Sequence, residues 1–374
     1  MVVFSWQSRL ITEETLVASH RVGILGCGNI FGRYVAGMAR YPELEIVRVA
    51  DVDVERAKKA AVEYDLPAWG DDVELYADDS VDIVVNLTPP VHHAATITAA
   101  LRAGKHVYVE KPLATTVSAA REVLATAAAS GRLLGSAPDT FLGSASQTAR
   151  RAVDDGLIGA PVGASMFVGH SKAERWHPDP RFLFRAGGGP VLDMGPYYVA
   201  ILVNLLGPIR TVAAASRIGA PVRALTAPNR AADSVEVEVA THASAVFTFT
   251  SGVLCTAQLS FDVWDSDLPF IEVYGTEGTL SLANPNNFDG DVRVKRHEDD
   301  EWRVLDPIVE LFGAVGTREQ HRRGLGVRDL ADAIEGGPQR ANPEFAFHVL
   351  ETLCAIEEGG MVTLDSTCER PAAR

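Results

Sequence analysis

The chain has 374 residues, more than one ordinary hydrophobic core contains, which suits two domains. Hydrophobic residues make up 47% of it and charged residues 22%, so the composition is that of a globular protein rather than a disordered one. With 34 Lys and Arg against 49 Asp and Glu, the formal charge of −15 repels nucleic-acid phosphates and anionic membranes. We therefore expect a small-molecule ligand, with no nucleic-acid or membrane partner.

Residues 1–20 lack a basic n-region and a continuous apolar h-region, so they predict an N-terminal extension rather than a secretion signal. Residues 21–140 alternate short apolar runs with helical patterns, which predicts a doubly wound parallel sheet. The strands of this sheet are expected at 22–25, 45–50, 81–87, 106–109 and 133–136, with connecting helices at 53–64 and 116–129. This is the layout of a dinucleotide-binding Rossmann domain.

A glycine turn at 26–30 joins the first predicted strand to a helix, as in a cradle for nucleotide phosphates. Phe31 takes the third glycine position, so a turn without a ligand remains an alternative. Asp51 follows the second strand, about twenty residues on, where a carboxylate accepts ribose hydroxyls and repels a 2′-phosphate. NAD is therefore expected rather than NADP, and Arg56 is the residue that could oppose this preference.

The strand at 106–109 ends in Glu110-Lys111-Pro112, which places a lysine at the strand end where open α/β sheets bind ligands. We expect the Lys111-Pro112 bond to be cis, because tight turns that aim a side chain into a cleft are where cis prolines occur. The four cysteines are widely separated and no His cluster has zinc spacing, so we expect no metal site and a cytoplasmic location.

Residues 141–374 predict an α+β domain for substrate binding and oligomerisation, with a helix at 146–155 and a large, open-faced, mostly antiparallel sheet. Alternating segments such as 235–239 and 291–295 are expected in that sheet. Helices at 328–335 and 345–358 could pack on this domain or return to the first. Alternation at 241–249 gives one apolar face, and a second face left uncovered would predict a homodimer or homotetramer.

A run of three glycines enters a helical pattern at 187–198, in which Asp193 and Tyr197 stand four residues apart and share a face. The alternative is that Asp193 caps the helix and Tyr197 is a buried aromatic side chain. Just upstream, Trp176, His177 and Arg181 form a loop that could hold a sugar ring against an aromatic face. Ordinary domain packing is the alternative for Trp176.

These segments together resemble the glucose-fructose oxidoreductase / inositol dehydrogenase (Gfo/Idh/MocA) family of NAD(P)-dependent oxidoreductases. The segments 88–93 (TPPVHH), 103–106 (AGKH), 110–112 (EKP) and 275–280 (GTEGTL) look like its TPxxxH, AGKH, EKP and GTEG signatures. The resemblance covers nearly the whole chain after residue 20.

The resemblance implies a substrate bound between the two domains, with Lys111 as the catalytic lysine and Asp193 as its acidic partner. Tyr197 stands where many members carry the histidine of a D-x-G-x-H pattern. The residues expected to bind the cofactor are Gly26, Gly28, Asn29, Ile30, Asp51, Thr88, Pro89, His93, Glu110 and Lys111. The residues expected to bind the substrate are Lys111, Trp176, His177, Arg181, Asp193 and Tyr197.

Oxidation of an alcohol requires a base for the hydroxyl proton and a hydride acceptor close to the carbinol carbon. Tyr197 is the predicted base, because the ammonium of Lys111 beside it would favour the phenolate. The leading expectation is an NAD-dependent dehydrogenase that oxidises a secondary hydroxyl of a sugar, polyol or glycoside. The two alternatives are NAD-dependent glycoside cleavage through transient oxidation and a non-catalytic NAD-binding regulator.

Overall fold

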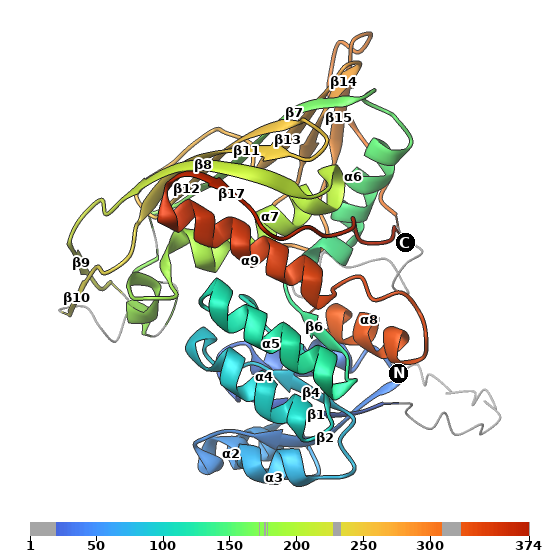
Figure 1. Cartoon of the computed structure of the whole chain (residues 1–374), viewed down its shortest axis with the longest axis vertical. Coiled ribbons are helices and arrows are strands. Elements are labelled where there is room, and N and C mark those ends of the chain that lie inside the picture. Colours follow the sequence, from blue (N-terminus) through green and yellow to red (C-terminus); the bar gives the residue numbers. More distant parts are fainter. Residues whose placement is uncertain are drawn as a thin grey trace, which may run out of the picture.

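The computed structural model describes residues 20–171, 173–175, 177, 179–226, 233–308 and 323–373. Two sheets dominate the molecule, with helices between them (Figure 1). The extension expected at 1–20 lies outside the described residues apart from His20, which begins the first strand.

The N-terminal sheet is parallel and has six strands in the order β3-β2-β1-β4-β5-β6. This order confirms the predicted doubly wound arrangement, in which the strand order reverses next to β1. Its strands are β1 His20–Leu25, β2 Leu44–Ala50, β3 Trp69–Gly70, β4 Ile83–Asn86, β5 His106–Val109 and β6 Leu134–Ser136. The sequence patterns indicated all of them except β3, which is only two residues long.

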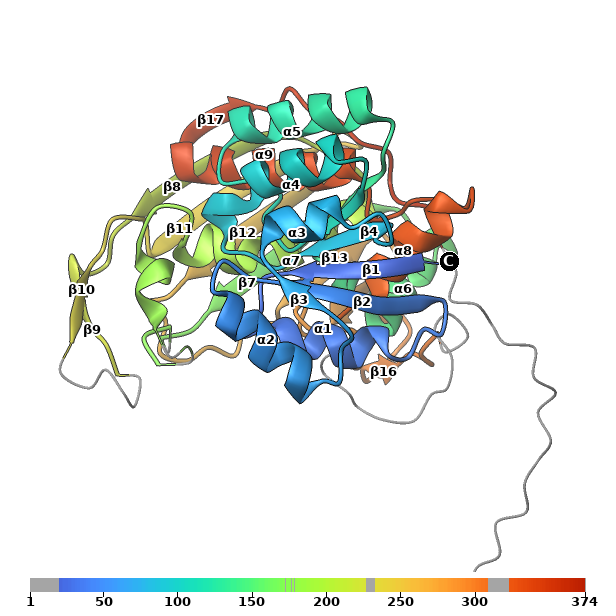
Figure 2. The same ribbon diagram turned by 90° about the horizontal axis from the view of Figure 1, so that it is seen from below.

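Helices cover both faces of this sheet: Figure 2 shows α3, α4 and α5 on one side and α1 and α2 on the other. The first helices are α1 Phe31–Met38, α2 Val54–Glu63, α3 Asp72–Ala77, the short η1 Pro90–His92, α4 His93–Arg102 and α5 Val117–Ser130. The side chains of Asp53 and Thr116 cap α2 and α5 by accepting backbone N–H groups, as Asp and Thr commonly do.

The second sheet has nine strands in the order β16-β15-β14-β13-β7-β12-β11-β8-β17. It is antiparallel apart from the pair β7 and β12, which confirms the predicted open-faced, mostly antiparallel sheet. Its strands are β7 Pro161–Gly169, β8 Ile209–Arg217, β11 His242–Phe249, β12 Leu254–Ser260, β13 Ile271–Gly275, β14 Gly278–Leu282, β15 Arg293–Arg296, β16 Arg303–Val304 and β17 Gly360–Thr363.

The expectation that 235–239 belongs to the large sheet is wrong. This segment supplies β10 Ser234–Glu236, which pairs only with β9 Val222–Ala224 in a separate two-stranded ribbon. The apolar side chains of the ribbon have their own partners, because Val235 and Leu225 pack with Phe184 in a small core beside the main one. The segment therefore finds its strand partner and its apolar contacts in the ribbon, without joining the large sheet.

The helices of the C-terminal part lie largely between the two sheets. They are η2 Thr140–Leu142, α6 Ser144–Asp154, η3 Pro180–Phe184, α7 Gly189–Leu206, α8 Leu325–Ile334 and α9 Pro343–Glu358. α7 packs on β12, β7 and β11, whereas α9 contacts β8 on one side and α5 and β6 on the other (Figure 1). α8 returns to the first sheet, where it contacts β5 and β6.

α7 is long and apolar enough to span a membrane by composition, but 89% of it is buried inside the protein, as expected for a core helix. The segment between α8 and α9 follows the outer edge of β6. Gln339 Nε2 donates to Leu134 O at 2.7 Å, and Ser136 N donates to Ala341 O at 3.1 Å. The edge strand of the parallel sheet is therefore covered by residues 339–341 of the same chain.

Candidate active site

The glycine turn after β1 has the geometry of a phosphate cradle. Gly26 has φ +100°, and a Cβ there would lie 2.9 Å from the carbonyl carbon of Leu87, so only glycine fits. A Cβ on Gly28 would instead enter open space, which leaves the turn accessible to a ligand. Ile30 precedes α1 without a side-chain cap, so no side chain occupies this helix start, the kind of position at which backbone N–H groups bind phosphate oxygens. The turn fits a dinucleotide pyrophosphate.

Asp51 lies at the end of β2, next to this turn, as its spacing predicted. Its carboxylate accepts hydrogen bonds from the backbone N–H groups of Cys27 and Asp53, both at 2.9 Å. Arg56 Nη1 lies 3.2 Å from Asp51 Oδ1, and its side chain is half-exposed. The turn thus carries a fixed carboxylate with one guanidinium across its outer side.

The loops after β4 and β5 are tied together by His93. The ring is fully buried, with Nδ1 2.7 Å from Pro112 O and Nε2 2.8 Å from Thr88 O. Burial lowers the pKa of His93, whereas the two carbonyl oxygens that face its ring nitrogens raise it. His93 therefore links the loop after β4 to the turn after β5. Pro89 precedes η1 on the same loop.

Glu110 and Lys111 form the turn after β5, and the Lys111-Pro112 bond is cis, as predicted. The carboxylate of Glu110 accepts a hydrogen bond from Tyr34 Oη at 2.8 Å and one from the Lys111 N–H at 3.0 Å. Burial raises the pKa of Tyr34 well above its usual range, so its hydroxyl stays the donor. These contacts fix the backbone from which the Lys111 side chain departs.

Lys111, Asp193 and Tyr197 meet between the two domains. Lys111 Nζ donates to Asp193 Oδ1 at 2.9 Å and to Asp193 O at 2.6 Å, and it lies 5.1 Å from the centroid of the Tyr197 ring. Asp193 lies inside α7, whose N-cap is Gly188, so the alternative that Asp193 caps the helix is excluded. Both side chains contact Lys111, which agrees with the prediction that Asp193 and Tyr197 share one face of the helix.

The charge of Lys111 is held firmly. Burial alone would lower the pKa of this ammonium, but Asp193 and then Tyr197 more than offset it, so the pKa is raised above its usual value. Lys111 is therefore a cation throughout the neutral range and is suited to bind an electron-rich oxygen rather than to accept a proton.

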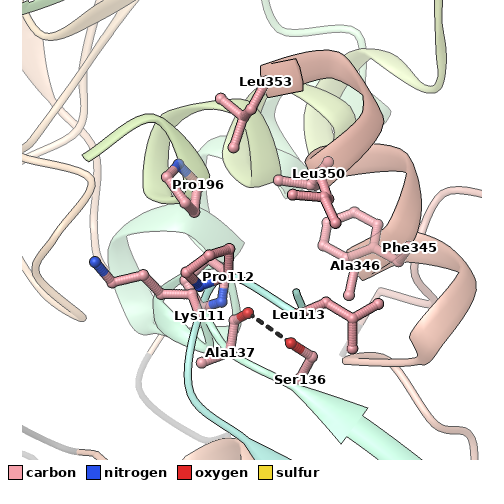
Figure 3. Close-up of a pocket in the computed structure, with 12 residues that line it drawn as sticks. Lys111, Pro112, Leu113, Ser136, Ala137, Pro196, Phe345, Ala346, Leu350 and Leu353 are labelled. Atoms are coloured by element: carbon pink, nitrogen blue, oxygen red, sulfur yellow. Dashed lines mark hydrogen bonds between the residues drawn. The ribbon is translucent and has the colours of Figure 1, made fainter. Parts of the chain in front are cut away.

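The underside of Lys111 is apolar. Figure 3 shows a small pocket there, and the lysine side chain points away from Leu113 and Ala346, which line it. Pro196 of α7 and Leu353 of α9 close the pocket. These apolar side chains pack beside the base of Lys111.

Arg323, which precedes α8, is a member of the site that the sequence did not indicate. Its Nη2 donates to Tyr197 Oη at 3.1 Å and to Asn286 Oδ1 at 3.0 Å, and its Nη1 lies 3.5 Å from Asp139 Oδ1. Asp139 is fully buried at the start of η2. No motif marks Arg323, which is brought to the site from 126 residues beyond Tyr197.

The loop expected to bind substrate is described only in part, because Trp176 lies outside the described residues. His177 Nδ1 is 2.7 Å from Asp179 O in the same loop, and its ring meets Phe182 edge to face at 5.0 Å. Arg181 pairs with Asp233 at 3.0 Å and lies 3.6 Å from Asp179. The structure therefore groups Arg181 with the β9–β10 ribbon rather than with Lys111. Across the described ranges, no three His, Cys, Asp or Glu side chains are grouped to hold a metal ion.

Comparison with known proteins identifies the family of this chain. The family described as "Oxidoreductase family, NAD-binding Rossmann fold" (GFO_IDH_MocA) matches residues 20–137, and the "GFO/IDH/MocA C-terminal domain" matches residues 146–281. The chain is 31% identical to 1,5-anhydro-D-fructose reductase of Ensifer adhaerens, over 77% of this chain and 84% of the relative. The chain belongs to the Gfo/Idh/MocA family.

Other members span almost the whole chain. D-xylose 1-dehydrogenase (NADP(+)) 2 of Haloferax volcanii is 29% identical over 92% of this chain and 99% of its own length. The crystal structure of an NAD binding oxidoreductase from Klebsiella pneumoniae superposes with a TM-score of 0.80 at 27% identity, covering 93% of this chain and 99% of that one. This Gfo/Idh/MocA protein is an oxidoreductase with an NAD-binding Rossmann fold.

Proposed function

We propose that this enzyme oxidises a secondary hydroxyl of a sugar, polyol or glycoside with NAD. The proposal rests on one observation: Lys111, which follows β5, contacts both Asp193 and Tyr197 of α7 next to the parallel sheet. Named relatives that act on sugars, such as the anhydrofructose reductase and the xylose dehydrogenase, support the substrate class.

The residues of this chain divide the work. The turn at Gly26 and Gly28 would hold the pyrophosphate, and Asp51 the adenosine ribose. When bound, the nicotinamide supplies the acceptor for the hydride. Lys111 binds the reacting oxygen and Asp193 orients Lys111.

Tyr197 takes the hydroxyl proton of the substrate while the carbinol carbon loses its hydride, which balances the two-electron oxidation. In the reductive direction the same phenol returns the proton to the carbonyl oxygen.

The direct experiment is a screen of sugars, polyols and glycosides with NAD that follows the absorbance of NADH. We expect net NADH formation with at least one free sugar or polyol. Glycoside consumption without net NADH would favour the cleavage reaction instead, because that reaction regenerates its cofactor in every cycle. Binding of NADH without turnover of any compound tested would contradict an enzymatic role.

Cofactor preference is a second expected outcome. Asp51 follows β2, where its carboxylate would repel a 2′-phosphate on the adenosine ribose. The kcat/KM with NAD should therefore exceed that with NADP by at least about tenfold, since placing like charges together costs several kcal/mol. Asp51→Ala should narrow the difference in kcat/KM between NAD and NADP. Arg56→Ala should widen it, because the half-exposed guanidinium is the group able to pair with a 2′-phosphate. Equal or higher kcat/KM with NADP in the parent enzyme would show the preference to be wrong.

Self-association of the chain is a third expected outcome. The inner face of β11 is buried, as predicted, through Ala243, Ala245, Phe247 and Phe249. On the opposite face, strand register aligns exposed Met361 and Val246 with Ala213 in one row across β17, β8 and β11. We propose that a second copy of the chain covers this face and gives a homodimer or homotetramer.

Light scattering on the full chain should report an oligomer at micromolar concentration, and Val246→Asp should shift it towards the monomer. Val222→Asp is the matched control, since Val222 is similarly exposed but lies on the β9–β10 ribbon. A monomeric parent would remove the proposal. We also propose a cytoplasmic location, because all four cysteines are unpaired thiols.

A further inference from the structure

Arg323 is a buried cation in contact with the residue proposed to carry the proton. Its side chain is 5% exposed, and its Nη2 donates to Tyr197 Oη at 3.1 Å. The guanidinium carbon also lies 5.3 Å from the centroid of the Tyr197 ring. The planar guanidinium is anchored at two further points, by Asn286 Oδ1 and Asp139 Oδ1. An arginine held in this way presents one N–H group in a fixed direction to the phenol oxygen.

Lys111, by contrast, meets Tyr197 through the ring. Its Nζ lies 5.1 Å from the ring centroid and gives hydrogen bonds to two oxygen atoms of Asp193. The two cations therefore differ in what they contact. Arg323 bonds to the oxygen that changes charge, whereas Lys111 stays paired with Asp193.

We infer that Arg323 is the positioning residue for Tyr197: it holds the phenol oxygen in place and stabilises its phenolate form. The inference rests on the proposed function, in which the Tyr197 oxygen accepts the substrate proton. A phenolate oxygen accepts the Arg323 N–H and still has a lone pair for the substrate hydroxyl. Arg323 itself exchanges no proton, because a guanidinium remains charged in proteins.

Other charged and titratable groups face Lys111 and Arg323. Asp193 faces Lys111, and Glu110 faces both Lys111 and Arg323. Asp139 and the hydroxyl of Tyr34 also face Arg323. Burial raises the pKa of Asp139, whereas Arg323 and the backbone N–H of Gly326 lower it.

The test is a pH titration of the full-length protein in which tyrosine is labelled at Cζ and followed by carbon NMR. The Tyr197 signal is identified by its loss in Tyr197→Phe. In Arg323→Gln, which keeps a donor but removes the charge, the midpoint of the Tyr197 titration should rise by about one to two pH units, as expected for the loss of a hydrogen bond to a charged group. Arg323→Lys should move it less.

Removal of a buried charge can disturb folding, so two further variants accompany the test. Arg323→Gln combined with Asp139→Asn leaves no unpaired charge and should show the same upward shift. Arg150→Gln is the matched control, because Arg150 is also buried and is paired with Asp154. It should lower thermal stability without moving the Tyr197 titration. The inference would be overturned if the Tyr197 midpoint did not move in Arg323→Gln or in its combination with Asp139→Asn while both proteins fold. A Tyr197 signal that titrates in none of the proteins would also overturn it.

Enzyme kinetics give the second readout. At neutral pH, Arg323→Gln should lower kcat about 10–100-fold, matching the shift in the titration, and higher pH should restore most of it. KM for NAD should change little. Because the NMR titration requires no substrate, it decides the role of Arg323 even if no sugar is oxidised. Failure of the proposed function is therefore distinguishable from failure of this inference.

Discussion

Lys111→Ala is expected to lower kcat by about 10²–10³-fold or more, the cost of removing one electrostatic contact to a developing oxyanion. The dissociation constant of NAD should remain close to that of the parent, because the residues placed at the adenosine and pyrophosphate belong to the turn after β1 and to Asp51. Steady-state turnover gives kcat, and isothermal titration calorimetry with NAD gives its dissociation constant.

A matched control is available in Lys105→Ala. Lys105 is also buried, and its Nζ donates to Asp78 O at 2.7 Å, away from the site. Its loss should reduce thermal stability and leave kcat near that of the parent. If Lys111→Ala retained turnover within a few fold of the parent, the role assigned to the lysine would be wrong.

Tyr197→Phe is expected to lower kcat by about 10²–10⁴-fold, the usual contribution of general acid–base catalysis. The substitution removes one hydroxyl from a side chain that is 4% exposed and leaves its ring packing in place. The fold should therefore persist, and the pH dependence of kcat/KM that reports this residue should disappear.

Tyr198→Phe is the control, since the neighbouring tyrosine is equally buried and burial raises its pKa above the usual range. It should leave the pH profile unchanged. Near-normal turnover of Tyr197→Phe with the profile of the parent would mean that the proton passes through Lys111 or His177, and Tyr197 would be a structural aromatic residue.

Local patterns in the sequence predicted much of this structure because they report backbone requirements. A left-handed turn beside the Leu87 backbone accepts only glycine at Gly26, and the apolar runs of the parallel sheet are buried on both faces. Helical spacing likewise placed Asp193 and Tyr197 on one face of α7. Each of these signals lies within a few residues of the feature it predicts.

The features that the sequence did not reveal depend on contacts between distant segments. Arg323 reaches Tyr197 only because α8 returns to the first sheet, and no local pattern distinguishes it from the other arginines of the chain. The fully buried position of His93 is equally a tertiary result. For 235–239, alternation predicted a strand but could not say which strand would pair with it, because alternation contains no information about partners.

The hydrogen bonds from residues 339–341 to β6 affect how far the cofactor-binding part can be separated from the rest. A fragment that ended near residue 140 would keep all six parallel strands and yet lose the partners of Leu134 O and Ser136 N. It would also lose α8, whose Gly326 packs closely against Tyr108. Transplanting the dinucleotide-binding half into another enzyme thus requires α8 and residues 339–341 as well.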